Sequence, residues 1–164
     1  TLVEAAAASH DPLMIAARLG HPPDLVMRRL AALKPAGFEQ VGLLVCDSAG
    51  ALILRRPAPG FPLPRPGDAC ALWPLYQALA RPAQPIARVV EMPGTDPKLF
   101  LCRALSVPRP AATFDAPPIH EATMLIEPVE HTSGPVLRVG ASCRICPRET
   151  CSARREPSIL GKQS

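Results

Sequence analysis

The sequence predicts an α+β domain, in which an N-terminal helical segment precedes a mainly antiparallel sheet of the GAF or PAS type. Apolar residues recur at helical spacing in the first 34 residues, whereas the later apolar runs are short and end at turn residues. The chain has 22 prolines among 164 residues, which excludes long helices from its second half. Aromatic residues make up only 4%, so we expect a core built from aliphatic side chains.

The helical segment, residues 1–36, predicts two short helices joined by a tight turn. Asp11 is placed to cap the first helix and Gly20 to end it, and Asp24 is placed to cap the second. Four apolar residues of the second helix are predicted to share one face: Leu25, Val26, Leu30 and Leu33. This outline fits a helix-turn-helix or a dimerisation arm, and both interpretations stay open.

The middle of the chain, residues 37–142, predicts the sheet. Residues 41–55 form a strand, a turn and a strand, because two apolar runs flank the turn sequence DSAG. Five prolines make residues 57–69 an extended connection. A helix is predicted over residues 70–82, with Pro74 in its first turn. Further strands are predicted over residues 85–93, 98–107, 122–129 and 136–143.

The C-terminal tail, residues 143–164, contains three cysteines at spacing C-x2-C-x4-C. Thiolates at this spacing bind zinc tetrahedrally, and the same ligands hold iron–sulfur clusters. Three thiolates are one short of a closed site, so a fourth ligand must come from elsewhere in the chain. The tail cysteines are Cys143, Cys146 and Cys151.

Cys70 is the best candidate for the fourth ligand. Cys46 and Cys102 lie inside apolar strand patterns, where a cysteine usually serves as a small buried hydrophobe. Cys70 instead follows PRPGDA at the predicted start of a helix, where its side chain can turn toward an ion. His120 and His131 remain alternatives.

Arginines and two aromatic residues suggest a site for an anionic ligand. Guanidinium groups suit phosphates, and a metal-tied loop would hold them with little loss of entropy. Trp73 and Tyr76 lie about one turn apart on one helix face and could line a ligand pocket. The arginines beside the cysteines are Arg144, Arg148, Arg154 and Arg155.

Several classes of protein are disfavoured. The segment HEATM at residues 120–124 has Met124 where a zinc peptidase needs its second histidine, and no nucleophile–base pair is evident, so we expect no enzyme. No stretch is long and apolar enough to predict a membrane span. Six cysteines without a secretory signal favour reduced thiols or metal ligands and a cytoplasmic location.

Two segments resemble the C-terminal effector domain of the short-chain fatty acyl transcriptional regulators, the family of propionate-responsive and glyoxylate-bypass regulators. Cys70 and Trp73 match a Cys-x-x-Trp pattern that precedes a helix in this family. The segment CRICPRETCSARREP, residues 143–157, matches the family's closing motif C-R-x-C-x-R-x-x-C-x-x-R. The resemblance covers residues 41–160.

This resemblance implies a ligand-sensing domain with acyl-CoA as its effector and a cysteine-bound metal centre that includes Cys70. The regulators of this family bind DNA through an N-terminal helix-turn-helix that is not recognisable in this sequence. We therefore expect DNA contact through another domain, and a homodimer. Two alternatives stay open: a zinc-ribbon-like interaction module without a small ligand, and a redox or iron sensor that holds a 4Fe–4S cluster.

Overall fold

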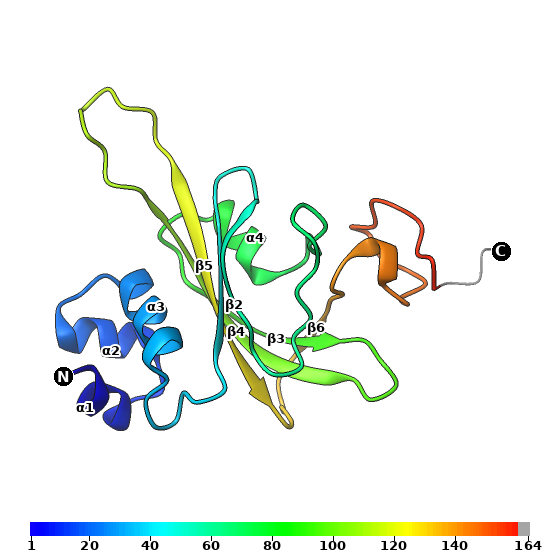
Figure 1. The fold of residues 1–164 in the computed structure, drawn as a ribbon, viewed down its shortest axis with the longest axis horizontal. Helices are drawn as coiled ribbons and strands as arrows, with labels where there is room; N and C mark the ends of the chain where they lie inside the picture. The colour runs from blue at the N-terminus through cyan, green and yellow to red at the C-terminus, as the bar shows by residue number, and fades with distance from the viewer. Residues whose placement is uncertain (161–164) are drawn as a thin grey trace.

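The computed structural model describes residues 1–160 as three helices followed by a six-stranded sheet that packs against a fourth helix (Figure 1). The helices are α1 (Leu2–Ala8), α2 (Pro12–Leu19), α3 (Pro23–Leu33) and α4 (Pro74–Leu79). The strands are β1 (Gly42–Cys46), β2 (Leu52–Arg56), β3 (Ile86–Met92), β4 (Lys98–Pro108), β5 (His120–Val129) and β6 (Val136–Arg138). The predicted α+β class, with helices first, is confirmed. None of the helices in residues 1–160 is long and apolar enough to cross a membrane.

Helix α2 begins and ends where the sequence predicts, whereas α4 is shorter than the predicted residues 70–82 and spans only Pro74–Leu79. The Asp11 carboxylate accepts the N–H of Leu13 at 2.9 Å, and Gly20 ends α2 with φ of 66°, a left-handed conformation that suits glycine. Pro74 occupies the first turn of α4, where its missing N–H is not needed. The predicted cap of α3 was wrong, because Asp24 lies in the first turn and makes no cap.

Helix α3 buries a different face from the one that the sequence predicts. Its buried residues are Val26, Met27, Leu30 and Ala31. Leu25 and Leu33 are instead 41% and 59% exposed. The spacing alone did not distinguish two overlapping apolar stripes, and packing against the sheet selected the one that includes Met27 and Ala31. Two leucines therefore stay at the surface.

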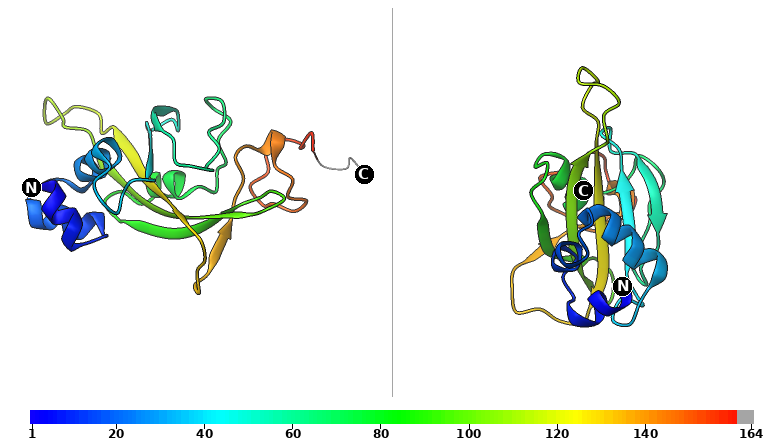
Figure 2. Two further views of the ribbon diagram at one scale, coloured as in Figure 1. Left: turned by 60° about the horizontal axis from the view of Figure 1, so that its bottom comes forward. Right: turned by 90° about the vertical axis from the view of Figure 1, so that its left-hand side faces the viewer.

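The sheet has the strand order β2-β1-β5-β4-β3-β6 and is antiparallel except for the β3–β6 pair. Its two faces carry separate cores, because alternate residues of a strand point to opposite sides. Leu44 of β1 and Met124 of β5 pack with α4, whereas Leu43 and Leu125 pack with the N-terminal helices. Figure 2 shows α4 and the helices α1–α3 on different sides of the curved sheet.

The last strand is shorter than predicted. Strand character was expected to residue 143, but β6 ends at Arg138 after three residues paired in parallel with β3. The next N–H, that of Val139, still donates to the Glu91 carbonyl at 3.1 Å. The chain then leaves the edge of the sheet and forms the cysteine-rich tail, which Figure 1 shows at the end of the molecule opposite the helices.

Two glutamates on β5 connect the N-terminal helices to the sheet. Glu127 accepts His10 at 2.9 Å and Arg103 of β4 at 3.0 Å. Glu121 pairs with Arg28 of α3 at 3.1 Å and with Arg109 at 3.3 Å. Each carboxylate thus bridges one basic group of the helical segment and one arginine that follows or belongs to β4.

Candidate cysteine centre and effector groove

Four cysteines meet at one small cavity between the tail and the start of the α4 segment. The cavity has a volume of about 20 Å³, and its lining includes Cys70, Cys143, Cys146 and Cys151. Neither His120 nor His131 is among the lining residues. The structure therefore brings together the four cysteines that the sequence singled out, although more than seventy residues separate Cys70 from the others.

Backbone contacts hold Cys70 beside the tail. The Cys70 N–H donates to the Ala141 carbonyl at 3.0 Å, and the Trp73 indole N–H donates to the Gly140 carbonyl at 2.8 Å. Gly140 itself is needed for close approach, because a Cβ there would lie 2.8 Å from the Cys146 sulfur. The Cys-x-x-Trp pattern thus places two groups, one thiol and one indole, against the same turn of the tail.

Two of the predicted ligand-binding arginines make extensive contacts with the protein itself. The Arg148 guanidinium donates to the carbonyls of Val139 at 2.8 Å and Glu91 at 2.7 Å, and its side chain is only 9% exposed. Arg154 donates to the carbonyls of Cys143 and Arg148. These contacts hold the tail in shape, and a role in binding an effector stays a prediction for both residues.

The electrostatic environment differs between the cysteines. Burial raises the pKa of the Cys70 thiol, and the neighbouring Cys143 and Cys146 raise it further. Partial burial also opposes ionisation of Cys143, but hydrogen bonds and the positive charge of Arg155 outweigh it and lower the pKa of Cys143. The Arg155 N–H lies 3.5 Å from the Cys143 sulfur. One thiol of the cavity is therefore predisposed to the thiolate form.

The prediction that the tail is a metal-bound loop is not met by the geometry. Within residues 1–160, no three side chains of His, Cys, Asp or Glu are arranged so that they could hold a metal ion. The donor set still fits a thiophilic ion in residue type, and all four cysteines line one cavity. The side chains would have to rotate toward one another to bind it.

A second hollow adjoins the cysteine cavity and contains two of the predicted ligand residues, Tyr76 and Arg155. This groove has a volume of about 380 Å³. The Tyr76 hydroxyl donates to the Gly50 carbonyl at 3.2 Å, and the Arg155 guanidinium donates to the Ala69 carbonyl at 2.6 Å. Burial raises the pKa of Tyr76 to about 12, so this residue remains a neutral hydrogen-bond donor at physiological pH. The rest of the lining is small: Ala49, Gly50, Ala51, Gly67, Ala69 and Ala71.

The remaining predicted residues have other positions. Trp73 is fully buried and stacks on Tyr76 with ring centroids 6.4 Å apart, so it supports the groove from inside the core. Arg144 is exposed on the tail. Cys46 and Cys102 are buried in the core as predicted, and burial raises the pKa of Cys46 to about 11.

Sequence reasoning missed Gly140 and the small residues of the groove. Gly140 could have been noticed as a glycine placed three residues before Cys143, between a strand and a metal-type motif. The alanines and glycines of the groove come from two separate loops, at residues 49–51 and 67–71. No local sequence pattern predicts that these two loops line the same groove.

Comparison with known proteins extends this description. Residues 36–163 match the family described as "Short-chain fatty acyl coenzyme A regulator, C-terminal". The chain is 30% identical over 171 residues to the "Propionyl-CoA carboxylase regulator" of Cereibacter sphaeroides, covering 96% of this chain and 37% of that protein. It is 28% identical to the "HTH-type transcriptional regulator RamB" of Mycobacterium tuberculosis, covering 83% of this chain and 32% of the relative.

The chain thus spans about a third of the length of the curated relatives it matches. A third relative, the "HTH-type transcriptional regulator PrpR" of Mycobacterium tuberculosis, is 26% identical over 93% of this chain and 34% of its own. The fold is shared with a solved structure named "Mycobacterium tuberculosis transcriptional regulator" at a TM-score of 0.78, with 24% identity over 94% of this chain and 51% of that one. The chain therefore belongs to the short-chain fatty acyl coenzyme A regulator family, and it is a regulator domain rather than an enzyme.

Proposed function

We propose that this chain is the effector-binding part of a transcriptional regulator and that it senses a short-chain acyl-CoA. The observation that carries the proposal is the groove of about 380 Å³ in which Tyr76 and Arg155 meet. The Arg155 guanidinium suits a CoA phosphate, because charge-assisted hydrogen bonds to phosphate are strong and geometrically specific. The small side chains around it let a ligand approach the backbone closely. The names of the family and of one relative point to the same class of metabolite.

Effector binding would act on DNA through a domain outside these residues, in a homodimer. A ligand shifts such a protein only if it binds one of two conformations more tightly than the other. Arg155 could make the affinity differ between two conformations, because it contacts the Ala69 carbonyl and Ala69 belongs to the lining of the groove. A ligand that competes for this guanidinium would release the loop around Ala69.

We further propose that Cys70, Cys143, Cys146 and Cys151 bind a metal centre, with zinc and a 4Fe–4S cluster as the two candidates. Their convergence on one cavity supports this proposal. A bound centre would tie the tail to the segment before α4 and would replace the protons of the thiols. Elemental analysis and the visible absorbance of anaerobically purified protein distinguish zinc from iron. Protein with neither metal, after reconstitution with each, would contradict the proposal.

Calorimetry with acetyl-, propionyl- and butyryl-CoA tests the effector. Arg155→Ala removes the charged donor at the groove, so we expect affinity to fall about ten-fold or more. Arg88→Ala is the matched control, because Arg88 is an exposed arginine on β3 outside the groove lining. Absence of both binding heat and thermal stabilisation with all three thioesters would refute acyl-CoA sensing. It would favour the interaction module without a small ligand.

Arg155 and the exposed Arg144 are better probes than Arg148 or Arg154. The latter two hold backbone carbonyls of the tail, so their loss would disturb the structure whether or not they bind a ligand. A variant of Arg144 is expected to change acyl-CoA affinity without changing the thermal midpoint. An effect of Arg155→Ala that accompanies a large loss of stability would not count as loss of a ligand contact.

A further inference from the structure

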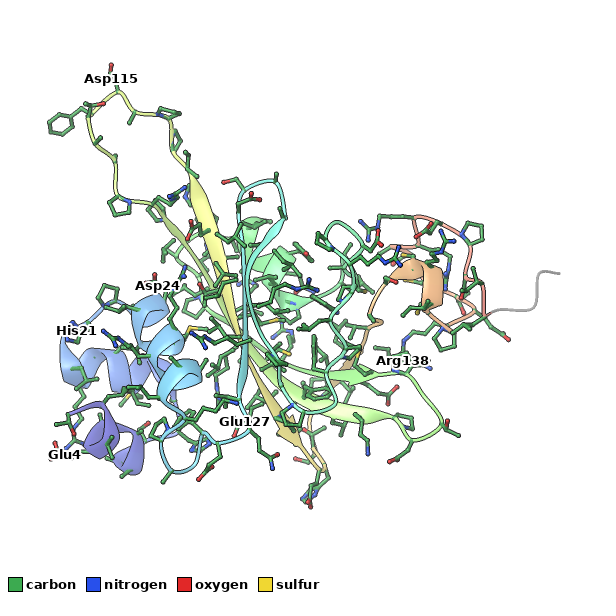
Figure 3. The ribbon with its side chains drawn as sticks, in the orientation of Figure 1. Glu4, His21, Asp24, Asp115, Glu127 and Arg138 are labelled. Carbon is green, nitrogen blue, oxygen red and sulfur yellow. The ribbon has the colours of Figure 1, made fainter. Side chains whose placement is uncertain are left out.

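The connection between β4 and β5 forms a projecting hairpin tip, residues 109–119. Phe114 is fully exposed at this tip, and Asp115 lies at its extreme end (Figure 3). Pro108 precedes the tip, and Pro110, Pro117 and Pro118 lie within it. Proline fixes the backbone and so reduces the entropy lost on binding. An exposed aromatic side chain on a stiffened arm has the features of an interface anchor.

An apolar groove of matching character lies on the N-terminal helices. It has a volume of about 380 Å³, and apolar residues of all three helices line it. Two of these, Leu25 and Leu33, are the leucines that α3 leaves exposed. Thr1 and two basic residues, His21 and Arg29, complete the lining.

We propose that the hairpin tip of one copy inserts Phe114 into the helical groove of a second copy. The chemistry of the two surfaces is complementary, since Phe114 meets leucines while the neighbouring Asp115 meets Arg29. Within residues 1–160, neither Asp115 nor Arg29 takes part in an ion pair. The groove is large enough for a phenyl ring and adjacent backbone.

The occupant is a second copy, because no residue of the tip is among those that line the groove of its own chain. Figure 3 shows Asp115 well separated from His21 on the helical segment, and Figure 1 shows the hairpin extending beyond the body of the molecule. Each copy has one tip and one groove, so a two-fold axis satisfies both contacts at once. A buried aromatic side chain removes about 150–250 Å² from water, so two such contacts bury less than the roughly 1,200 Å² at which stable specific interfaces begin. We therefore expect a reversible dimer.

This inference specifies the homodimer of the proposed function, and it can fail independently of effector binding. Sedimentation equilibrium on the full 164-residue chain measures the dimer dissociation constant. Phe114→Ser is expected to weaken dimerisation about ten-fold or more, because anchor residues carry most of the energy of an interface. Ile53→Ser, at an exposed isoleucine on β2, is the matched control and leaves the constant unchanged.

A charge exchange identifies the partner surface. Asp115→Arg and Arg29→Asp each place like charges together and weaken the dimer, whereas the double variant restores it. The proposal is overturned by a monomeric wild-type chain, by dimerisation that ignores Phe114→Ser, or by failure of the double variant to recover. A photoreactive aromatic at position 114 that cross-links within its own chain, or to a surface other than α1–α3, also overturns it. Acyl-CoA calorimetry on Phe114→Ser separates this outcome from the effector proposal, since the groove at Tyr76 is unchanged.

Discussion

Gly140 lies against the Cys146 sulfur, and an added methyl group would occupy the space of that thiol. Gly140→Ala is expected to displace Cys146 and to destabilise the protein by about 1–3 kcal/mol, the usual effect of overpacking. The metal content after reconstitution should fall with it. Urea unfolding and elemental analysis measure the two effects.

Gly134→Ala is the control for this substitution, because a Cβ at residue 134 would have its nearest contact, the Thr132 hydroxyl, at 3.8 Å. It should leave both stability and metal content unchanged. A Gly140→Ala protein that matches wild type in both measurements would show that Cys146 can move at no cost and is not held in the cavity.

Cys143 is expected to be the most reactive thiol of the metal-free protein. Its lowered pKa places the thiolate form at a lower pH than in an ordinary cysteine, so alkylation by iodoacetamide should begin at lower pH. Cys46, whose pKa is raised to about 11, should stay unmodified in the folded protein below that pH. Arg155→Ala removes the charge that favours the thiolate and should slow the reaction of Cys143 near neutral pH. Peptide mass spectrometry after timed alkylation gives the order, and faster labelling of Cys46 would contradict it.

At the scale of elements, Arg148 attaches the tail to the edge of the sheet. Its guanidinium bonds the carbonyls of Val139 and Glu91 and lies 3.4 Å from the Glu91 carboxylate. Arg148→Met should lower the free energy of unfolding by roughly 2–4 kcal/mol, because it removes hydrogen bonds from a charged donor and leaves a carbonyl without its partner. Urea unfolding followed by fluorescence of Trp73 gives the value.

Arg138 provides a close comparison, since it pairs with the same Glu91 carboxylate at 3.6 Å but is 72% exposed. Exposed ion pairs contribute little, so Arg138→Met should change stability by less than about 1 kcal/mol. Equal effects of the two substitutions would mean that the Glu91 carboxylate matters and that the backbone contacts of Arg148 do not.

The sequence predicted elements well where local chemistry determines them. Asp11 and Gly20 delimit α2, and Pro74 begins α4, because caps and prolines act on the nearest turn of backbone. The sequence predicted elements less well where tertiary contacts determine the buried face or the end of an element. The exposed side of α3 depends on how the helix packs against the sheet, and the early end of β6 depends on the contact between the tail and Cys70. Neither contact has a local signal in the sequence.

The candidate site shows the same division. The four cysteines could be selected from spacing and from the apolar surroundings of Cys46 and Cys102. The structural roles of Arg148 and Arg154 could not, because their partners are backbone carbonyls whose position depends on the folded tail. The groove beside Tyr76 could not be predicted, because alanines and glycines form its walls and these residues have no functional groups that indicate a site.

At the scale of the whole molecule, the helical segment and one face of the sheet form a common core. Helices α1–α3 bury Leu43, Val45 and Leu125 on this face of the sheet, together with Val41, which precedes β1. Removal of residues 1–36 would expose these side chains, each of which contributes about 1.5–3 kcal/mol when buried. That loss is comparable to the total stability of a domain of this size. We expect the shortened chain to bind the dye ANS and to aggregate.

Removal of residues 1–8 alone is the milder comparison, because α1 contributes only Ala5 and Ala6 to the fully buried core. It should lower the thermal midpoint without aggregation. A chain of residues 37–164 that stays monomeric with an unchanged midpoint would instead support a helical segment that is independent of the sheet domain.

The wide separation of Cys70 from the tail has a consequence for biosynthesis. The chain leaves the ribosome from its N-terminus, so the sheet and α4 can form while the last residues are still in the exit tunnel. The cavity cannot exist until Cys151 has emerged, since three of its four cysteines lie in residues 143–151. Closure of the tail onto Ala69 and Cys70 therefore has to wait for the synthesis of Cys151. Cys70 would stay uncovered while residues 71–151, about half of the chain, are synthesised, and products truncated before Cys143 would lack all three tail cysteines.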